Sequence, residues 1–229
     1  MTDARTEILS RVREALGDGG STPAGPVPRQ YRAAGEHPPG SGTVLDVLVD
    51  RLEDYKAHVH QVPAAEVPAV LARLVRSSAA GTRGSGTSEP ATRGSVVVPD
   101  GLDPAWVRGL GAVEVHTDSP GAPLSAVELD GIGAVVTAAR VAVAETGTIV
   151  LDGAPDQGRR AISLVPDVHV CVVRADQVVQ TVPEAVRLLG TDPGRPLTWI
   201  SGPSATSDIE LDRVEGVHGP RTLHVVLVS

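Results

Sequence analysis

The sequence predicts an α/β protein with an open, mixed and mostly parallel sheet covered by helices. Short runs rich in valine and isoleucine recur between glycine, proline and aspartate residues, which is typical of buried strands. Segments with apolar residues at helical spacing lie between several of these runs, and such alternation places helices on both faces of a parallel sheet. With 229 residues, 41% of them hydrophobic, the chain is long and apolar enough for one main domain.

The first part of the chain differs from the rest in composition. Residues 1–17 carry apolar side chains at helical spacing and end at a glycine, which predicts an amphipathic helix. Residues 18–42 are rich in Gly, Pro and Ser and predict a linker, so that residues 43–229 form the α/β domain. The N-terminus is charged throughout, and no apolar run approaches the ~20 residues of a membrane span. We therefore expect a cytoplasmic protein.

The elements of the main domain follow in order. A Thr-x-x-Asp start resembling a capping box predicts a helix from Thr43, whose buried face would hold Val44, Leu48, Leu52 and Tyr55. A second helix is expected over roughly 66–79, and the glycine-rich stretch 81–95 predicts an exposed loop. The strands expected next are 95–98, 112–115, 132–136, 148–151, 168–173, 197–200 and 223–228, with helices over 103–110 and 183–190.

One segment predicts a hairpin instead of a crossover. In VAVAETGTIVL, residues 141–151, two apolar runs flank a Thr-Gly pair with no room for a helix between them. The sheet is therefore expected to be mixed.

Composition excludes several classes of function. The net charge of -8, without a basic stripe, argues against a nucleic-acid partner, because such binding needs clustered Lys and Arg. Lys56 is the only lysine, and no phosphate-binding GxxxxGK[ST] loop is present. Cys171 is the only cysteine, so this chain cannot supply the thiolates of an iron-sulfur cluster. We expect no cofactor bound by the chain itself, and any cluster would belong to a partner.

Two histidine-containing pairs have the spacing of metal ligands in a strand. His58 and His60 are two residues apart, as are His169 and Cys171, and residues at this spacing share one face of a strand. The sequence shows no third ligand at a useful spacing. We interpret the first pair as exposed at the end of a helix and the second as packed within a strand. The GSG within 81–95 lacks the spacing of GxGxxG and is interpreted as a surface loop.

The segment SGPSATSDIE, residues 201–210, directly follows a predicted strand. It predicts a strand-to-helix turn in which Ser201, Gly202 and Ser204 present hydroxyl and backbone N–H groups to an anion at a helix N-terminus. Asp208 could then polarise a hydroxyl or accept a proton. In the alternative interpretation, a serine only caps the helix and Asp208 only favours its dipole. The local pattern leaves both open.

Two other titratable residues lie in polar turns. His218 stands in EGVHGP and could act as acid, base or ligand, or simply bond a loop carbonyl. Glu145, in AETGT, could be a nucleophile or a base, or an ordinary turn residue. No GxSxG motif is present, which disfavours a hydrolase triad.

The segments AETGT at 144–148, SGPSATSDIE at 201–210 and GVHGP at 216–220 resemble the lactate utilization protein C family of LUD-domain proteins. The resemblance extends from about Thr43 to the C-terminus, and the leading helix before a linker is also similar to that family. Many members carry a basic residue where this chain has Ala205, which weakens the expectation of tight anion binding. The resemblance implies a fold similar to ribose-5-phosphate isomerases, glucosamine-6-phosphate deaminases and CoA transferases.

The resemblance also implies a function and a candidate site. The function is the oxidation of L-lactate to pyruvate in the cytoplasm, beside iron-sulfur partner proteins. The candidate catalytic residues are Glu145, Asp208 and His218, and a small carboxylate or phosphorylated ligand would be bound by Thr146, Gly147, Thr148, Ser201, Gly202, Ser204 and Gly219.

Two other functions stay open. One is a free-standing enzyme acting on a phosphorylated or CoA-linked small molecule, with Glu145 as nucleophile or base, because a fold does not fix a function. The other is a scaffold in which the polar turns only shape the sheet.

Overall fold

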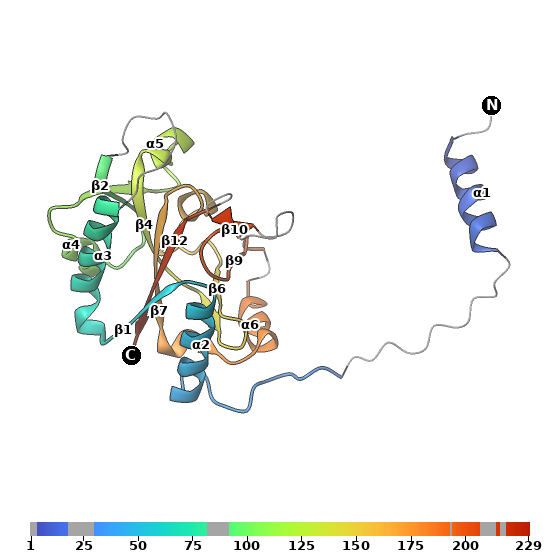
Figure 1. The fold of residues 1–229 in the computed structure, drawn as a ribbon, viewed down its shortest axis with the longest axis horizontal. Helices are drawn as coiled ribbons and strands as arrows, with labels where there is room; N and C mark the ends of the chain where they lie inside the picture. Colours follow the sequence, from blue (N-terminus) through green and yellow to red (C-terminus); the bar gives the residue numbers. More distant parts are fainter. Residues whose placement is uncertain (1–3, 18–29, 82–91, 193, 207–213, 216–218) are drawn as a thin grey trace. The chain divides into compact units, whose positions relative to one another are not determined.

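The computed structural model describes residues 4–17, 30–81, 92–192, 194–206, 214–215 and 219–229. Its contacts divide the chain into two units, Met1–Arg32 and Ala33–Ser229. The first unit contains helix α1 (Ala4–Leu16), on which no residue is buried. The second contains the sheets (Figure 1).

The main sheet has six strands that are all parallel, which confirms the predicted α/β class. Their carboxyl ends therefore lie along one edge, where ligands of α/β proteins usually bind. In spatial order the strands are β1 (His58–Val62), β12 (Thr222–Val228), β7 (Val168–Arg174), β4 (Ile132–Ala138), β2 (Thr92–Pro99) and β3 (Glu114–Asp118).

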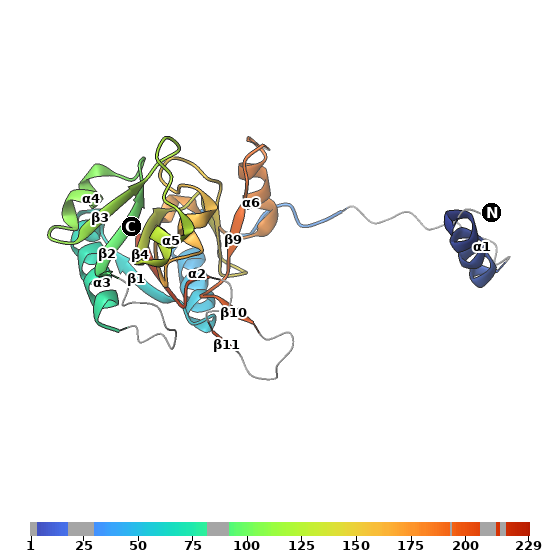
Figure 2. The same ribbon diagram turned by 90° about the horizontal axis from the view of Figure 1, so that it is seen from above.

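Each face of the main sheet has its own apolar core. Helices α3 (Val67–Gly81) and α4 (Pro104–Gly109) cover one face, where Leu71 and Val75 pack against Val170 and Val226. Helix α2 (Gly42–Asp54) and a second, smaller sheet cover the other face (Figures 1 and 2). On α2, Val44, Leu48 and Leu52 are buried as predicted, because residues four apart lie on one side of a helix. The prediction is wrong for Tyr55, which caps the end of α2 and is exposed.

The second sheet has the order β8-β5-β6-β9 and contains the predicted hairpin. Strands β5 (Val141–Val143) and β6 (Thr148–Leu151) pair antiparallel, and β6 also pairs antiparallel with β9 (Thr198–Ile200). Strand β8 (Val178–Val179) lies parallel to β5, and helix α6 (Val182–Leu189) packs on this sheet. The shorter elements are α5 (Ala126–Asp130) and the 3-10 turns η1 (Ala64–Glu66), η2 (Arg160–Ser163) and η3 (Ala175–Gln177).

Some details of the prediction are wrong. Residues 58–62 form the edge strand β1 and not the end of a helix, because their backbone pairs with β12 from the far end of the chain. Helix α2 begins at Gly42 after Ser41, which makes no side-chain cap hydrogen bond, so the expected Thr43 capping box is absent. Strand β2 already begins at Thr92, within the predicted loop, of which residues 82–91 lie outside the described residues.

No helix among the described residues is both long enough and apolar enough to cross a membrane.

Candidate functional site

The AETGT turn joins β5 to β6 and extends the pairing of β5 with β8. The Ala144 N–H donates to the carbonyl of Val179 at 2.9 Å, and the Glu145 N–H donates to the carbonyl of Gln180 at 3.1 Å. The Gly147 N–H closes the turn on the Ala144 carbonyl at 3.2 Å. The second sheet thus determines the position of Glu145.

The Glu145 side chain is half-buried and is held by an amide. Gln180 Nε2 donates to Glu145 Oε1 at 3.1 Å. The Oε1 atom of the same amide accepts from the backbone N–H groups of Glu36 at 2.8 Å and His37 at 3.0 Å. Gln180 therefore links the candidate glutamate to the segment that precedes α2.

Three hydroxyl side chains form a chain where β6 begins and β9 ends. Thr148 Oγ1 lies 2.8 Å from Thr146 Oγ1 and 2.8 Å from Ser201 Oγ. Antiparallel pairing of Ile149 with Ile200 brings these residues together, since Thr148 precedes the first and Ser201 follows the second. Thr148 is buried, whereas Thr146 and Ser201 are exposed. The structure thus brings together three of the predicted ligand-binding residues, two of which are exposed.

Two predicted ligand-binding glycines lie against the C-terminal end of α2. Gly147 has φ 56°, and a Cβ added to it would lie 2.9 Å from Arg51 Cβ. Gly202 has φ 82°, and an added Cβ would lie 2.6 Å from the Tyr55 carbonyl oxygen. Both positions need glycine for backbone conformation and for close approach to the helix. These contacts are structural reasons for the Thr-Gly and Ser-Gly pairs of the motifs.

The predicted strand-to-helix turn after β9 is described only in part, because residues 207–210 lie outside the described residues. Strand β10 (Ala205–Thr206) follows the turn and pairs antiparallel with β11 (Val214–Glu215). Residues 205 and 206 are thus paired in a strand, and the anion pocket expected at a helix start stays a prediction. The cross-strand partner comes from farther along the chain, and the local pattern does not identify it.

The remaining candidates near this turn have different outcomes. Ser204 and Gly219 lie close together: the Ser204 N–H donates to the Pro220 carbonyl at 2.8 Å, and a Cβ on Gly219 would lie 3.4 Å from Ser204 Cβ. Asp208 and His218 lie outside the described residues. The structure therefore assigns no geometry to two of the three predicted catalytic residues.

Sequence reasoning missed a cavity of about 530 Å³ at the carboxyl edge of the main sheet. Asp100 directly follows β2 and Asp118 ends β3, while Leu151 and Thr198 of the second sheet contribute the opposite side. The signal was available in principle, because polar residues at the carboxyl ends of parallel strands mark the usual binding edge. The complete lining is Asp100, Asp118, Pro120, Pro123, Leu151, Gly153, Ala154, Pro155, Gly158, Arg159, Arg160, Ser163, Pro196 and Thr198.

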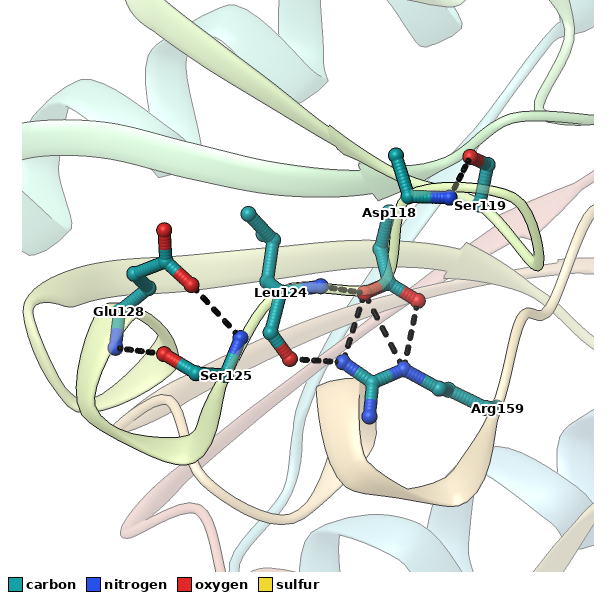
Figure 3. A network of polar contacts seen from close by, with 7 residues as sticks. Asp118, Ser119, Leu124, Ser125, Glu128 and Arg159 are labelled. Carbon is teal, nitrogen blue, oxygen red and sulfur yellow. Dashed lines mark hydrogen bonds and ion pairs between the residues drawn. The ribbon is translucent and has the colours of Figure 1, made fainter.

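An ion pair between Asp118 and Arg159 forms part of the cavity lining (Figure 3). Arg159 Nε lies 2.9 Å from Asp118 Oδ2, and Arg159 Nη2 lies 2.8 Å from Asp118 Oδ1. The Leu124 N–H donates to Asp118 Oδ1 at 2.9 Å, and Arg159 Nη2 also donates to the Leu124 carbonyl. Burial of Asp118 acts to raise its pKa, but the Arg159 and Leu124 hydrogen bonds lower it overall. The hydrogen bond with Asp118 raises the pKa of Arg159, so both groups stay charged.

The structure supplies a third histidine next to the predicted pair. His224 of β12 is the register partner of His58, and its Nδ1 lies 3.2 Å from His60 Nε2. The rings of His58 and His224 stack with centroids 5.0 Å apart. Burial, followed by the nearby histidines, lowers the pKa of His224 to about 4. Even so, no group of three or more His, Cys, Asp or Glu side chains in the described part of the chain is placed to hold a metal.

The second pair, His169 and Cys171, is packed inside the sheet as predicted. Both side chains are buried, and Thr137 Oγ1 lies 2.8 Å from His169 Nε2. Burial lowers the pKa of His169 to about 4 and raises the pKa of the Cys171 thiol to about 12. The only cysteine of the chain is therefore an un-ionised core residue, unsuited to bind a metal or act as a nucleophile.

Comparisons with known proteins agree with this architecture. The LUD domain matches residues 45–228. The chain is 43% identical to Lactate utilization protein C of Deinococcus radiodurans, over 99% of this chain and 96% of that protein. It is 25% identical to Lactate utilization protein C of Bacillus velezensis, over 97% and 94% of the two chains.

A solved structure is similar as well. It is the crystal structure of a DUF162 family protein from Deinococcus radiodurans, with 43% identity and a TM-score of 0.64. The match covers 82% of this chain and 97% of the solved chain. Because the domain match spans most of the chain and the relative of 43% identity spans nearly all of it, this chain belongs to the LUD domain family.

Proposed function

We propose that this chain acts in lactate utilization, as a component without a cluster that supports the oxidation of L-lactate to pyruvate. The observation that carries the proposal is the 43% identity, over nearly the full length of both chains, to a protein named Lactate utilization protein C. In this proposal the chain works in the cytoplasm together with iron-sulfur partner proteins.

The chemistry of the reaction supports a division of labour. Oxidation of lactate to pyruvate removes two electrons and two protons, so an electron acceptor is required. The one cysteine of this chain is buried and un-ionised, which leaves it unable to hold an iron-sulfur cluster. In the proposed system the electrons therefore pass to the partner proteins.

The proposed contribution of this chain is a polar surface near the AETGT turn. The buried Thr148 orients the hydroxyls of the exposed residues Thr146 and Ser201. The two contacts with Thr148 use two of the three hydroxyl protons, so this chain of hydroxyls can donate one hydrogen bond to a carboxylate. Gly147, Gly202, Ser204 and Gly219 shape the surrounding turns. Glu145, Asp208 and His218 are the proposed catalytic groups.

Growth on lactate tests the proposed function. A strain deleted for this chain is expected to fail on L-lactate as sole carbon source, to grow on acetate, and to recover when the intact gene is restored. Restoring a gene with Thr148→Val and Ser201→Ala is expected to recover growth poorly, whereas Thr191→Val, which removes an exposed hydroxyl at the end of α6, is expected to recover it fully. Normal growth of the deletion strain on L-lactate, without a second lactate route, would contradict the proposal.

The placement of Glu145 favours a second candidate, the free-standing enzyme with a carboxylate nucleophile or base. The amide of Gln180 orients the half-buried Glu145 carboxylate, as catalysis by such a group requires. In this candidate Glu145 attacks an acyl group of a CoA-linked substrate and displaces the thiol, leaving an anhydride on the protein. Mass spectrometry after incubation with an acyl-CoA is expected to show an adduct on the intact chain and none on Glu145→Gln. Equal labelling of both proteins, or of neither, would exclude the acyl-transfer form of this candidate.

A further inference from the structure

The Asp118–Arg159 pair fixes a guanidinium on the wall of the cavity and leaves one of its amino groups without a partner in the described part of the chain. Arg159 uses Nε and Nη2 to bind Asp118 and the Leu124 carbonyl, and Nη1 has no partner among the described residues (Figure 3). The Asp118 side chain is only 2% exposed, whereas that of Arg159 is 39% exposed. A buried carboxylate thus holds a solvent-facing cation in one orientation, which reduces the entropy lost when that cation binds a ligand.

The adjacent arginine lines the same cavity and is available for binding. Arg160 is exposed, and its guanidinium pairs with no carboxylate in the described part of the chain. Arg160 begins the turn η2, which is held by the Ser163 hydroxyl donating to the Arg160 carbonyl at 3.1 Å. Guanidinium groups bind carboxylate and phosphate through paired N–H donors. Two neighbouring arginines with free donors on one cavity wall therefore favour an anionic group.

The other side chains of the cavity indicate what is attached to that anion. Asp100 is an exposed carboxylate in the lining and can only accept hydrogen bonds when ionised, so it fits a hydroxyl donor. Most of the remaining lining is apolar and rigid, and is contributed by Pro120, Pro123, Leu151, Pro155 and Pro196. A ligand with hydroxyl groups and an extended body would contact all three kinds of surface.

The size of the cavity argues that the ligand is larger than lactate. Sites for drug-sized ligands have volumes of roughly 300–1,000 Å³, and this cavity has about 530 Å³. Lactate has only three carbon atoms and would leave most of the cavity to water. One wall is preformed, since the Gly101 N–H donates to the Pro155 carbonyl at 3.0 Å and a Cβ on Gly101 would collide with Pro155.

We infer that the cavity at the carboxyl ends of β2 and β3 binds a hydroxyl-bearing organic anion larger than lactate. Its carboxylate or phosphate contacts Arg160 and the free amino group of Arg159, a hydroxyl donates to Asp100, and its body lies against the prolines. The site lies at the other end of the β6–β9 pair from the Thr148–Ser201 contact, because Leu151 pairs with Thr198 and Ile149 with Ile200. The inference does not depend on a role in lactate utilization.

Binding by the purified full-length chain tests the inference. The probes are AMP and gluconate, which join hydroxyl groups to a phosphate and to a carboxylate respectively, with adenosine, inorganic phosphate and L-lactate as controls. Affinity is measured by calorimetry, and the site is located by NMR shifts of backbone amides. We expect AMP or gluconate to bind more tightly than all three controls and to shift the amides of Gly153, Gly158 and Thr198. Binding of AMP but not gluconate would identify the anionic group of the ligand as a phosphate. Binding of gluconate but not AMP would identify it as a carboxylate.

Variants separate this site from general charge attraction. Arg160→Gln is expected to lower the affinity roughly tenfold for the probe that binds, because it removes charge-assisted hydrogen bonds. Arg108→Gln, which removes an exposed arginine on α4, is expected to leave the affinity unchanged. The inference is overturned if neither AMP nor gluconate binds at millimolar concentration, if adenosine binds as tightly as AMP, or if the two variants weaken binding equally. It is also overturned if the shifts map to Thr146 and Ser201, and none of these results depends on lactate growth.

Discussion

Asp118 and His169 are buried on the same sheet, yet Asp118 stays charged and His169 stays neutral because their partners differ. Asp118 accepts hydrogen bonds from the Arg159 guanidinium, which stabilises the carboxylate. His169 has the neutral hydroxyl of Thr137 beside Nε2 and no counter-charge, so burial disfavours its protonated form. Asp118 orients an arginine in the lining of the cavity, whereas His169 is a core residue whose protonation opposes folding.

His169 therefore predicts a loss of stability in mild acid. Its pKa is about 4 in the folded state and near 6.5 in the unfolded chain, so the unfolded state binds a proton first as the pH falls. The stability that neutral His169 contributes is complete above pH ~6.5 and declines towards pH ~4, with about 2 kcal/mol lost between pH 7 and pH 5. Urea unfolding of His169→Gln is expected to show a pH dependence reduced by about this amount.

A matched variant separates His169 from the other titrating groups. His37 is exposed, and its backbone, not its ring, bonds to Gln180. His37→Gln is expected to retain the full pH dependence of the parent chain. If His169→Gln loses stability between pH 7 and pH 5 as steeply as the parent does, the assignment to His169 is wrong.

At the scale of elements, the two glycine-containing turns of the motifs are predicted to act as contact points for α2. Gly147→Ala and Gly202→Ala should each lower the free energy of unfolding by about 2 kcal/mol or more, because a Cβ adds backbone strain at positive φ and collides with Arg51 or Tyr55. Gly121→Ala is the control, since nothing lies within 4 Å of its added Cβ, and it should change stability by less than about 0.5 kcal/mol. Urea unfolding measures the free energy of unfolding of the three variants. Equal values would refute the proposal that the two turns are contact points for α2.

How well each element could be predicted depended on where its partner lies. The β5–β6 hairpin and the buried face of α2 follow from local spacing, and both are confirmed. Strand β1 has a polar, histidine-containing sequence and is stabilised by pairing with β12 from the other end of the chain, so its local pattern did not predict a strand. Strand β10 likewise depends on β11, and its hydroxyl-rich sequence also suits a helix start.

The candidate site shows the same limit. The contact of Thr148 with Ser201 follows from β6–β9 pairing, which a motif search finds only as two separate segments. Asp118 and Arg159 lie 41 positions apart and belong to no recognisable motif, so the cavity that both residues line could be found only from the fold. Local sequence thus identified polar turns, whereas the parallel order of the strands determines which of them meet.

At the scale of the whole molecule, the described helix of the first unit and the segment that precedes α2 in the second unit differ in burial and bonding. Every described residue of α1 is exposed, including the apolar Ile8, Leu9, Val12 and Leu16. By contrast, the segment before α2 is bonded to the domain: the Gly40 N–H donates to the Val178 carbonyl at 2.9 Å, and Arg187 donates to the Ala33 carbonyl. The two parts of the N-terminal region should therefore differ in their effect on stability.

Two truncations test this difference. Deletion of residues 1–32 is expected to change the free energy of unfolding by less than about 0.5 kcal/mol, because it removes no buried side chain that the structure describes. Deletion of residues 1–41 also removes the bonds to Val178, Gln180 and Arg187 and should cost about 2 kcal/mol or more. It would also release Gln180 from Glu36 and His37, and so loosen the amide that holds Glu145. Urea unfolding of both truncated chains decides the matter: an equal loss of stability in the two would mean that residues 1–32 contact the domain.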